Sequence, residues 1–157
     1  MILWNNALVN APSLKTFDQA YADGAWWGRL VENAVGSHLL NSLQGPQWNV
    51  TYWREAGEEV DFVVSHGVHL WAIEVKSGRS NKVRYLDTSG PSMARRSTRP
   101  WERRHLLSTD WGSNKPTGLT AFLNRYPKAK TWLVGESGLP LIEFFSGPAQ
   151  QWFTSEL

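Results

Sequence analysis

Apolar residues recur at helical spacing in the stretch that follows Asp23, and Gly45-Pro46 marks a stop for that pattern. The stripe consists of Trp27, Leu30, Val31, Ala34, Val35 and Leu39. Asp23 suits the N-cap because its carboxylate can accept hydrogen bonds from free N–H groups of the first turn. We therefore predict a helix over Asp23–Leu43 that is apolar enough to be mostly buried.

Three β-strands are expected after this helix. Apolar and polar residues alternate over Trp48–Arg54, and the segment is rich in β-formers. Ala56-Gly57 then turns the chain into Glu58–Gly78, which reads as two apolar strands joined by a short turn at residues 65–68. The pattern therefore predicts a strand followed by a hairpin.

The periodicity disappears over Arg79–Pro116 and returns afterwards. The spacing predicts a helix over Thr117–Tyr126 and strands over Thr131–Gly135 and Leu141–Phe145. The core order is helix-strand-strand-strand-helix-strand, which predicts an α/β fold with a central mixed sheet flanked by helices. Residues 1–157 suit a single domain, and we interpret residues 79–116 as an insertion in it.

Charged side chains interrupt the apolar hairpin. Because side chains alternate along a strand, Glu74 and Lys76 share one face. A two-residue turn at His66-Gly67 would place Asp61 opposite Ala72 and diagonal to Glu74, on that same face, whereas a three-residue turn would send it to the other face. We expect a hairpin that is apolar on one side and carries two acids and a lysine on the other.

Such a cluster suits metal-assisted hydrolysis of phosphodiesters. Two carboxylates can hold Mg²⁺ or Mn²⁺, and a lysine can orient or deprotonate the attacking water. The alternative without a catalytic role is a solvated sheet face on which Lys76 forms an ion pair with Glu74 or Asp61. The three residues alone leave both interpretations open.

Composition narrows the class of protein. The chain has no cysteine, which excludes disulfides and thiolate metal sites, and its 41% hydrophobic and 19% charged residues are typical of a soluble globular protein. The first ten residues lack the features of a signal peptide, and no apolar run reaches the ~20 residues of a membrane helix. We expect a cytoplasmic protein without membrane contact, and its oligomeric state stays open.

The positive charge is concentrated in the insertion. Residues 82–115 carry eight Lys/Arg and three Asp/Glu, although the whole chain has a net charge of only +2. The candidate nucleic-acid-binding residues there are Arg95, Arg96, Arg99, Trp101, Arg103 and Arg104. Arginines can contact phosphates while a tryptophan stacks on a base, so DNA is the expected partner. A solvated loop, or an insertion without a role, are the alternatives.

Segments of the sequence resemble two groups of known proteins. The segments EVDFVV and WAIEVKSG resemble the core of the PD-(D/E)XK nuclease superfamily, which carries an aspartate on one strand and (D/E)-x-K on the next. The chain also resembles the C-terminal domain of a prokaryotic AAA-type ATPase family, in those two segments and in WNNALVNA, GRLVENAVGSHLL, YWRE and LTAFLNRYP. That domain has no assigned function.

The resemblance implies a restriction-endonuclease-like fold and assigns roles position by position. Asp61 and Glu74 would be ligands of Mg²⁺ or Mn²⁺, with the backbone carbonyl of Val75 as a further ligand. Lys76 would be the catalytic lysine. Glu32 would complete the metal site from the first helix, and its neighbours at i−4 and i+4 are glycines, which favours close approach to other backbone.

There are departures from the family pattern. Val60 stands where the motif has its proline, and the insertion lengthens the path to the second helix. No Gly-Lys dipeptide occurs, so the chain has no phosphate-binding P-loop and is not itself an ATPase. Two functions follow: a Mg²⁺-dependent DNA nuclease module, or a catalytically idle module that binds DNA or partners for an AAA-type ATPase.

Overall fold

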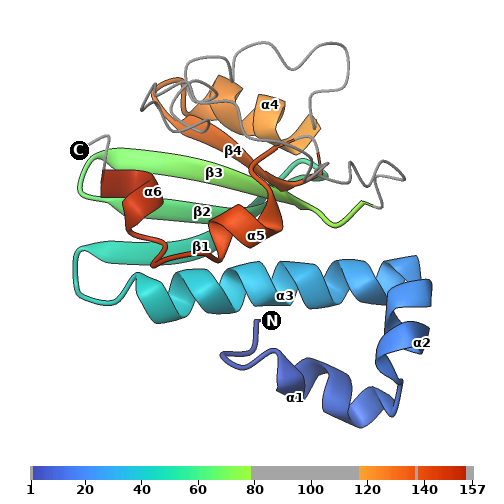
Figure 1. Ribbon diagram of the computed structural model, residues 1–157. Coiled ribbons are helices and arrows are strands. Elements are labelled where there is room, and N and C mark those ends of the chain that lie inside the picture. The colour runs from blue at the N-terminus through green and yellow to red at the C-terminus, as the bar shows by residue number, and fades with distance from the viewer. Residues whose placement is uncertain (1, 79–116, 137, 155–157) are drawn as a thin grey trace, which may run out of the picture.

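The first long helix is the element that the sequence predicts best. The computed structural model describes residues 2–78, 117–136 and 138–154 (Figure 1). Helix α3 spans Gly24–Ser42, and the Asp23 carboxylate accepts a hydrogen bond from the backbone N–H of Trp26 at 3.1 Å. The predicted N-cap and helix are both confirmed.

A mixed four-stranded sheet forms the centre of the fold. It comprises β1 (Trp48–Glu55), β2 (Glu58–His66), β3 (His69–Lys76) and β4 (Lys130–Gly135), in the spatial order β1-β2-β3-β4. The first three strands are antiparallel neighbours, and β4 runs parallel to β3. Helix α4 (Thr117–Arg125) precedes β4. The predicted α/β class and the order helix-strand-strand-strand-helix-strand are confirmed.

Short helices lie at both ends of the chain (Figure 1). At the N-terminus these are α1 (Ala7–Asn10), the 3₁₀ turn Ala11–Ser13 and α2 (Phe17–Ala22); at the C-terminus they are α5 (Leu141–Phe144) and α6 (Gln151–Thr154). None of them was predicted, because runs of three to six residues are too short for a helical period to show.

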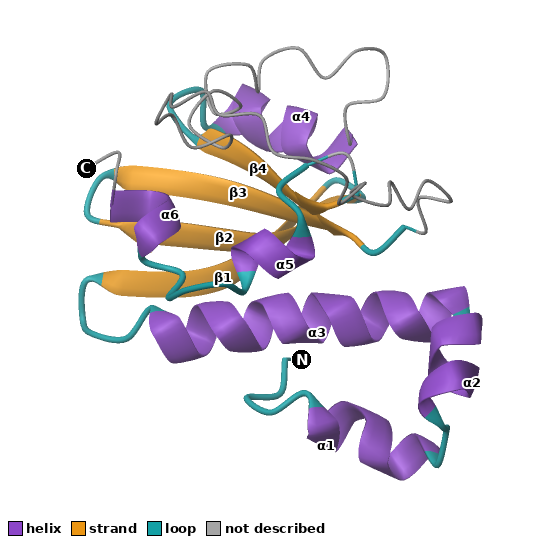
Figure 2. Ribbon diagram, in the orientation of Figure 1, coloured by secondary structure: helices purple, strands orange, loops and turns teal. Residues whose placement is uncertain are grey.

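Helices cover both faces of the sheet (Figure 2). The larger core lies between the sheet and α3, α5 and α6, and includes Val35, Leu39, Phe62, Trp71 and Phe153. The smaller core lies under α4 and consists of Val60, Val63, Ala72, Leu119 and Phe122. The prediction of a hairpin that is apolar on one side only is therefore wrong. Its central residues are buried on both faces because a helix packs on each.

The segment Leu141–Phe145 is a helix, so the prediction of a strand there is wrong. After β4 the chain turns back at Gly135, whose φ is 108°, and pairing with the sheet is limited to a single bridge between Val134 and Leu139. Pro140 follows at the N-cap of α5 and has no N–H with which to continue a ladder. Tertiary context therefore overrides the β propensity of Leu-Ile-Glu-Phe-Phe.

The hairpin register differs from the predicted one by two residues. His66 pairs with His69, so that Gly67 and Val68 form the turn, and Gly67 has a φ of 58°. Ala72 therefore lies opposite Val63 rather than Asp61. Glycine accepts this left-handed conformation without the steric cost that His66 would meet there.

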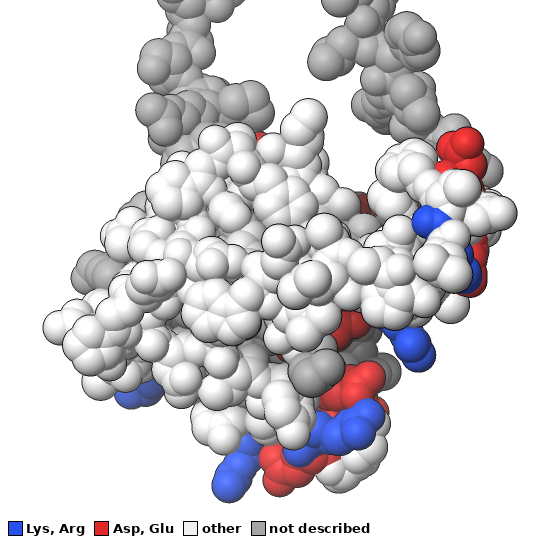
Figure 3. Space-filling model, turned by 90° about the horizontal axis from the view of Figure 1, so that it is seen from below, with Lys and Arg blue, Asp and Glu red and all other residues white. Residues whose placement is uncertain are grey.

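Little charge lies on the face that α1, α2 and α3 form. Figure 3 shows this face from below, with Lys, Arg, Asp and Glu gathered at its edges. Large apolar side chains of the N-terminal segment are exposed, among them Trp4, Leu8, Leu14 and Phe17. Within the described residues, no helix has the length and apolar character needed to cross a membrane.

Candidate functional site

A β-bulge sets the position of Asp61. Thr51 pairs with Val63 and Trp53 pairs with Val60, so Tyr52 alone lies opposite two residues, Asp61 and Phe62. A bulge of this kind bends its strand and redirects side chains, and bulges are frequent beside active sites. Here Asp61 becomes part of a cavity on the α3 side of the sheet.

Two glycines on α3 bring Glu32 close to the sheet. A Cβ added at Gly36 would lie 2.8 Å from the ring of Phe62, and one added at Gly28 would lie 3.4 Å from the Ser77 hydroxyl. The helix face that carries Gly28, Glu32 and Gly36 therefore packs directly against the hairpin. This face approaches its neighbours closely, but it does so through their side chains and not through the backbone as predicted.

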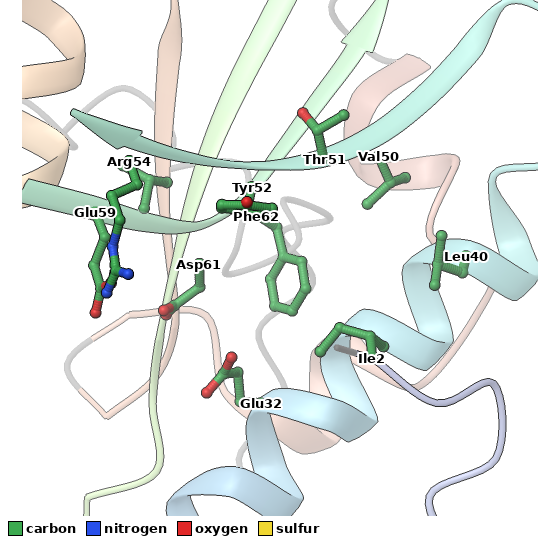
Figure 4. Close-up of a pocket in the computed structure, with 11 residues that line it drawn as sticks. Ile2, Glu32, Leu40, Val50, Thr51, Tyr52, Arg54, Glu59, Asp61 and Phe62 are labelled. Carbon is green, nitrogen blue, oxygen red and sulfur yellow. The ribbon is translucent and has the colours of Figure 1, made fainter.

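Glu32 and Asp61 meet in a cavity of about 550 Å³ between α3 and the strands β1 and β2. Their carboxylates point toward each other in the middle of the cavity (Figure 4). The Arg54–Glu59 pair lies at one end, and Ile2, Leu40 and Val50 line the other; the remaining wall consists of Thr51, Tyr52, Val60 and Phe62.

Hydrogen bonds fix the N-terminal wall of this cavity. The buried Asn33 side chain accepts from the Leu3 backbone N–H at 2.8 Å and donates to the Leu3 carbonyl at 3.2 Å. The segment is thereby held on α3, and Ile2 comes to lie at Gly36 beside Phe62. The apolar end of the cavity is therefore built by long-range contacts.

Partial burial is the main cause of the raised pKa values of Asp61 and Glu32. The pKa of Asp61 is raised to about 6, mainly by desolvation and to a smaller extent by the negative charges of Glu74 and Glu32. The backbone N–H of Val75 donates to Asp61 Oδ2 at 2.8 Å and opposes that rise. Desolvation also raises the pKa of Glu32, and the charges of Glu59 and Glu74 act in the same direction. Carboxylates that repel each other in a partly buried site attract a cation.

Glu74 and Lys76 form an ion pair at the end of β3. Lys76 Nζ lies 2.6 Å from Glu74 Oε1, and the two side chains are 49% and 13% exposed, respectively. Lys76 lowers the pKa of Asp61 through its charge, so the ammonium is within electrostatic reach of the cavity. The predicted acids and lysine thus form one electrostatic unit around Asp61.

The described part of the chain does not contain a preformed metal site. In residues 2–78, 117–136 and 138–154, no group of three or more His, Cys, Asp or Glu side chains is arranged to hold a metal ion. The Val75 contact with Asp61 runs through its N–H, and the predicted role of its carbonyl stays untested. The basic residues Arg95, Arg96, Arg99, Trp101, Arg103 and Arg104, with the whole predicted insertion 79–116, lie outside the described residues.

Three cavity residues were missed in the sequence. Tyr52 and Arg54 come from β1, and Glu59 comes from β2. The segment Tyr-Trp-Arg-Glu was recognised as part of a family resemblance, but alternation alone does not show which of its residues meet Asp61. That juxtaposition depends on the bulge and on the β1–β2 pairing.

Comparison with known proteins identifies a family. Residues 27–106, just over half of the chain, match the family described as Domain of unknown function (DUF4143). The chain belongs to this family. The DUF4143 match contains every candidate site residue from Glu32 to Arg104 and ends before α4. No curated protein and no solved structure matches the chain.

Proposed function

We propose that this DUF4143 chain is a metal-dependent nuclease module of the PD-(D/E)XK type that hydrolyses phosphodiester bonds in DNA. The observation that carries the proposal is the meeting of Glu32 and Asp61 in one cavity, within electrostatic reach of Glu74 and Lys76. A purely structural role does not explain two facing carboxylates in one cavity (Figure 4), each with a raised pKa.

The donor set fits a hard divalent cation. Carboxylate oxygens are the ligands that Mg²⁺ and Mn²⁺ prefer, and a cation would remove the repulsion among the acids. Glu32, Asp61 and Glu74 would hold it, with the Val75 carbonyl as a further candidate. When bound, the cation supplies Lewis-acid stabilisation of the negative charge that develops on the phosphate.

Lys76 carries the proton chemistry in this proposal. Its ammonium is held 2.6 Å from Glu74 Oε1, which fixes the position of its N–H donors. From there it can orient a water molecule for in-line attack or donate a hydrogen bond to the phosphate oxygens. Partial burial of Glu32 and Asp61 in the cavity strengthens the electrostatic interactions of these two acids.

Titration calorimetry with Mn²⁺ tests the metal site. We expect the wild-type protein to bind Mn²⁺, and Asp61→Asn or Glu74→Gln to weaken binding at least tenfold, because an amide is a poor ligand for a hard cation. Lys76→Ala should retain binding. Asp18→Asn, an exposed acid on α2, serves as the matched control and should bind like the wild type. Absence of any binding heat at millimolar Mn²⁺ would contradict the proposal.

A second function is favoured by a specific observation. The acids already have protein partners, Lys76 for Glu74 and the Val75 N–H for Asp61, and no preformed three-ligand group exists in the described residues. An idle site of this kind would suit a module that binds DNA or an AAA-type ATPase partner. It predicts no Mn²⁺ binding and DNA affinity that is unchanged by Asp61→Asn.

A further inference from the structure

We infer that the cavity between α3 and β1–β2 admits an unpaired nucleotide and that Tyr52 and Arg54 hold it, so that the substrate is single-stranded or frayed nucleic acid. This inference rests on the proposed nuclease function and adds the substrate class and two binding residues to it. Three features support it: the size of the cavity, its two chemically distinct ends, and the exposure of Tyr52 and Arg54 on β1.

The size of the cavity selects an unpaired strand. Its volume of about 550 Å³ lies in the ~300–1,000 Å³ range of pockets that hold a single small ligand. A base pair within a duplex presents only its groove edges, and enzymes that act on a nucleotide in a small pocket take it out of the stack or require a single strand. Glu32 and Asp61 lie within this cavity, so a phosphate reaches them together with an unpaired neighbour.

The two ends of the cavity match the two parts of a nucleotide. One end is apolar and consists of Ile2, Leu40 and Val50, which suits a base or sugar; the other end carries Arg54, which suits a phosphate (Figure 4). The acid pair lies between these ends, where the scissile phosphate would be held. A strand that runs through the cavity would therefore meet apolar, acidic and basic groups in turn.

Arg54 is oriented for this role by Glu59. Its Nη2 and Nε donate to Glu59 Oε2 at 2.6 and 3.1 Å, which leaves other N–H groups of the guanidinium available. The two side chains are 69% and 62% exposed, so the pair contributes little to stability. A guanidinium held in one orientation is well suited to bind a phosphate.

Tyr52 offers an open aromatic ring at the bulge. It is 77% exposed although it lines the cavity, and it lies opposite Asp61 and Phe62. An exposed tyrosine side chain adds no packing to the hydrophobic core. An aromatic face beside an acid pair can stack on an unpaired base. Stacking of this kind tolerates any base, so we expect little sequence preference.

Binding of labelled oligonucleotides by fluorescence anisotropy tests the inference. The 157-residue chain is titrated in Ca²⁺ against a 20-nucleotide single strand and its blunt duplex, as wild type, Tyr52→Ala, Tyr52→Phe and Arg54→Gln. We expect Tyr52→Ala to weaken single-strand binding about 5- to 150-fold, the range for loss of one stacked base. Tyr52→Phe should keep wild-type affinity because its ring can still stack.

Arg125→Gln is the matched control for Arg54→Gln. Arg125 is exposed at the end of α4, on the opposite face of the sheet from the cavity. We expect Arg54→Gln to weaken single-strand binding and lower its salt dependence by about 0.7 per lost phosphate contact, whereas Arg125→Gln should change neither. Melting temperatures of all variants should match the wild type, which separates loss of binding from loss of fold.

The outcomes separate this inference from the proposed nuclease function. Single-strand binding that depends on Tyr52 and Arg54 supports the inference even if no cleavage is found in Mg²⁺ or Mn²⁺. A different result would overturn the inference and leave the nuclease proposal standing. In that result Lys76→Ala abolishes cleavage, the wild type cleaves duplex and single strand equally, and Tyr52→Ala has no effect. Absence of single-strand binding would overturn the inference as well.

Discussion

Replacement of the two glycines that flank Glu32 tests the packing on which the site depends. Gly28 and Gly36 lie on the same face of α3, one turn before and one turn after Glu32. A Cβ at Gly36 would meet two ring carbons of Phe62 at 2.8 and 2.9 Å and the Ile2 side chain at 2.9 Å. A Cβ at Gly28 would make only an ordinary contact, 3.4 Å from the Ser77 hydroxyl.

The magnitudes follow from two opposing effects. Alanine is favoured over glycine in a helix by about 1 kcal/mol, and both variants gain this. Only Gly36→Ala also forces a buried ring to move, because Phe62 is 4% exposed, and overpacking of this kind costs about 1–3 kcal/mol. Gly28→Ala should therefore be more stable than Gly36→Ala by about 1–3 kcal/mol, which for a chain of this size is about 2–12 °C in melting temperature.

Urea unfolding followed by tryptophan fluorescence measures this difference. The change should appear in the urea midpoint at constant slope for both variants. Because the displaced helix carries Glu32 away from Asp61, Gly36→Ala should also weaken Mn²⁺ binding, whereas Gly28→Ala should not. Equal stability of the two variants would refute the described contact between α3 and β2.

Further predictions concern pH, the C-terminal helix and the ion pair. The pKa of Asp61 is raised to about 6, so the folded state holds this proton more tightly than the unfolded chain; the resulting stability of about 1–3 kcal/mol is present below pH 4 and lost as pH rises through 6. Asp61→Asn should flatten the melting temperature between pH 4 and 7. Phe144→Ala should lower the free energy of unfolding in urea by about 3–5 kcal/mol, because Phe144 is fully buried. Ile142→Asp should lower it by less than about 0.5 kcal/mol, because Ile142 is 86% exposed. In a strand the two side chains would share one face, and the two effects would not differ in this way. Lys76→Ala should cost less than about 1 kcal/mol, since its pair with Glu74 is half exposed on the lysine side; a larger drop in melting temperature would indicate a structural ion pair.

Local periodicity predicted the main elements of the fold. The helical stripe of α3 and the apolar runs of the hairpin are local patterns, so their bounds agree with the structure within a few residues. Glu32 was assigned from the family resemblance, and its flanking glycines supported that assignment; the contacts at Gly36 show that this helix face lies close to Phe62 and Ile2.

Local sequence patterns do not predict which residues surround Asp61. The register error of two residues kept the parity of the hairpin, but the bulge opposite Tyr52 changes what Asp61 meets. The bulge depends on the pairing of β1 with β2 and on packing against α3. The alternation of apolar and polar residues along a strand shows neither of these. Tyr52, Arg54 and Glu59 were missed for the same reason.

The C-terminal segment illustrates the limit of propensity. Leu141–Phe145 is rich in strand formers, and only its surroundings decide otherwise. The chain turns away after Gly135, a single bridge forms at Leu139, and Pro140 begins a helix that buries Phe144. A five-residue apolar run is compatible with either structure until its neighbours are known.

Cleavage of a labelled single-stranded oligonucleotide tests the central claim most directly. Wild-type protein and Lys76→Ala are incubated with substrate in Mg²⁺, in Mn²⁺ and with excess EDTA, and the products are resolved by length. We expect wild-type cleavage that requires the divalent cation, and a loss of at least 100-fold in Lys76→Ala, the usual contribution of a positioned acid–base group, while its melting temperature stays within a few degrees of the wild type. Wild-type protein that cleaves nothing in either cation, or equal cleavage by both proteins in EDTA, would contradict the account.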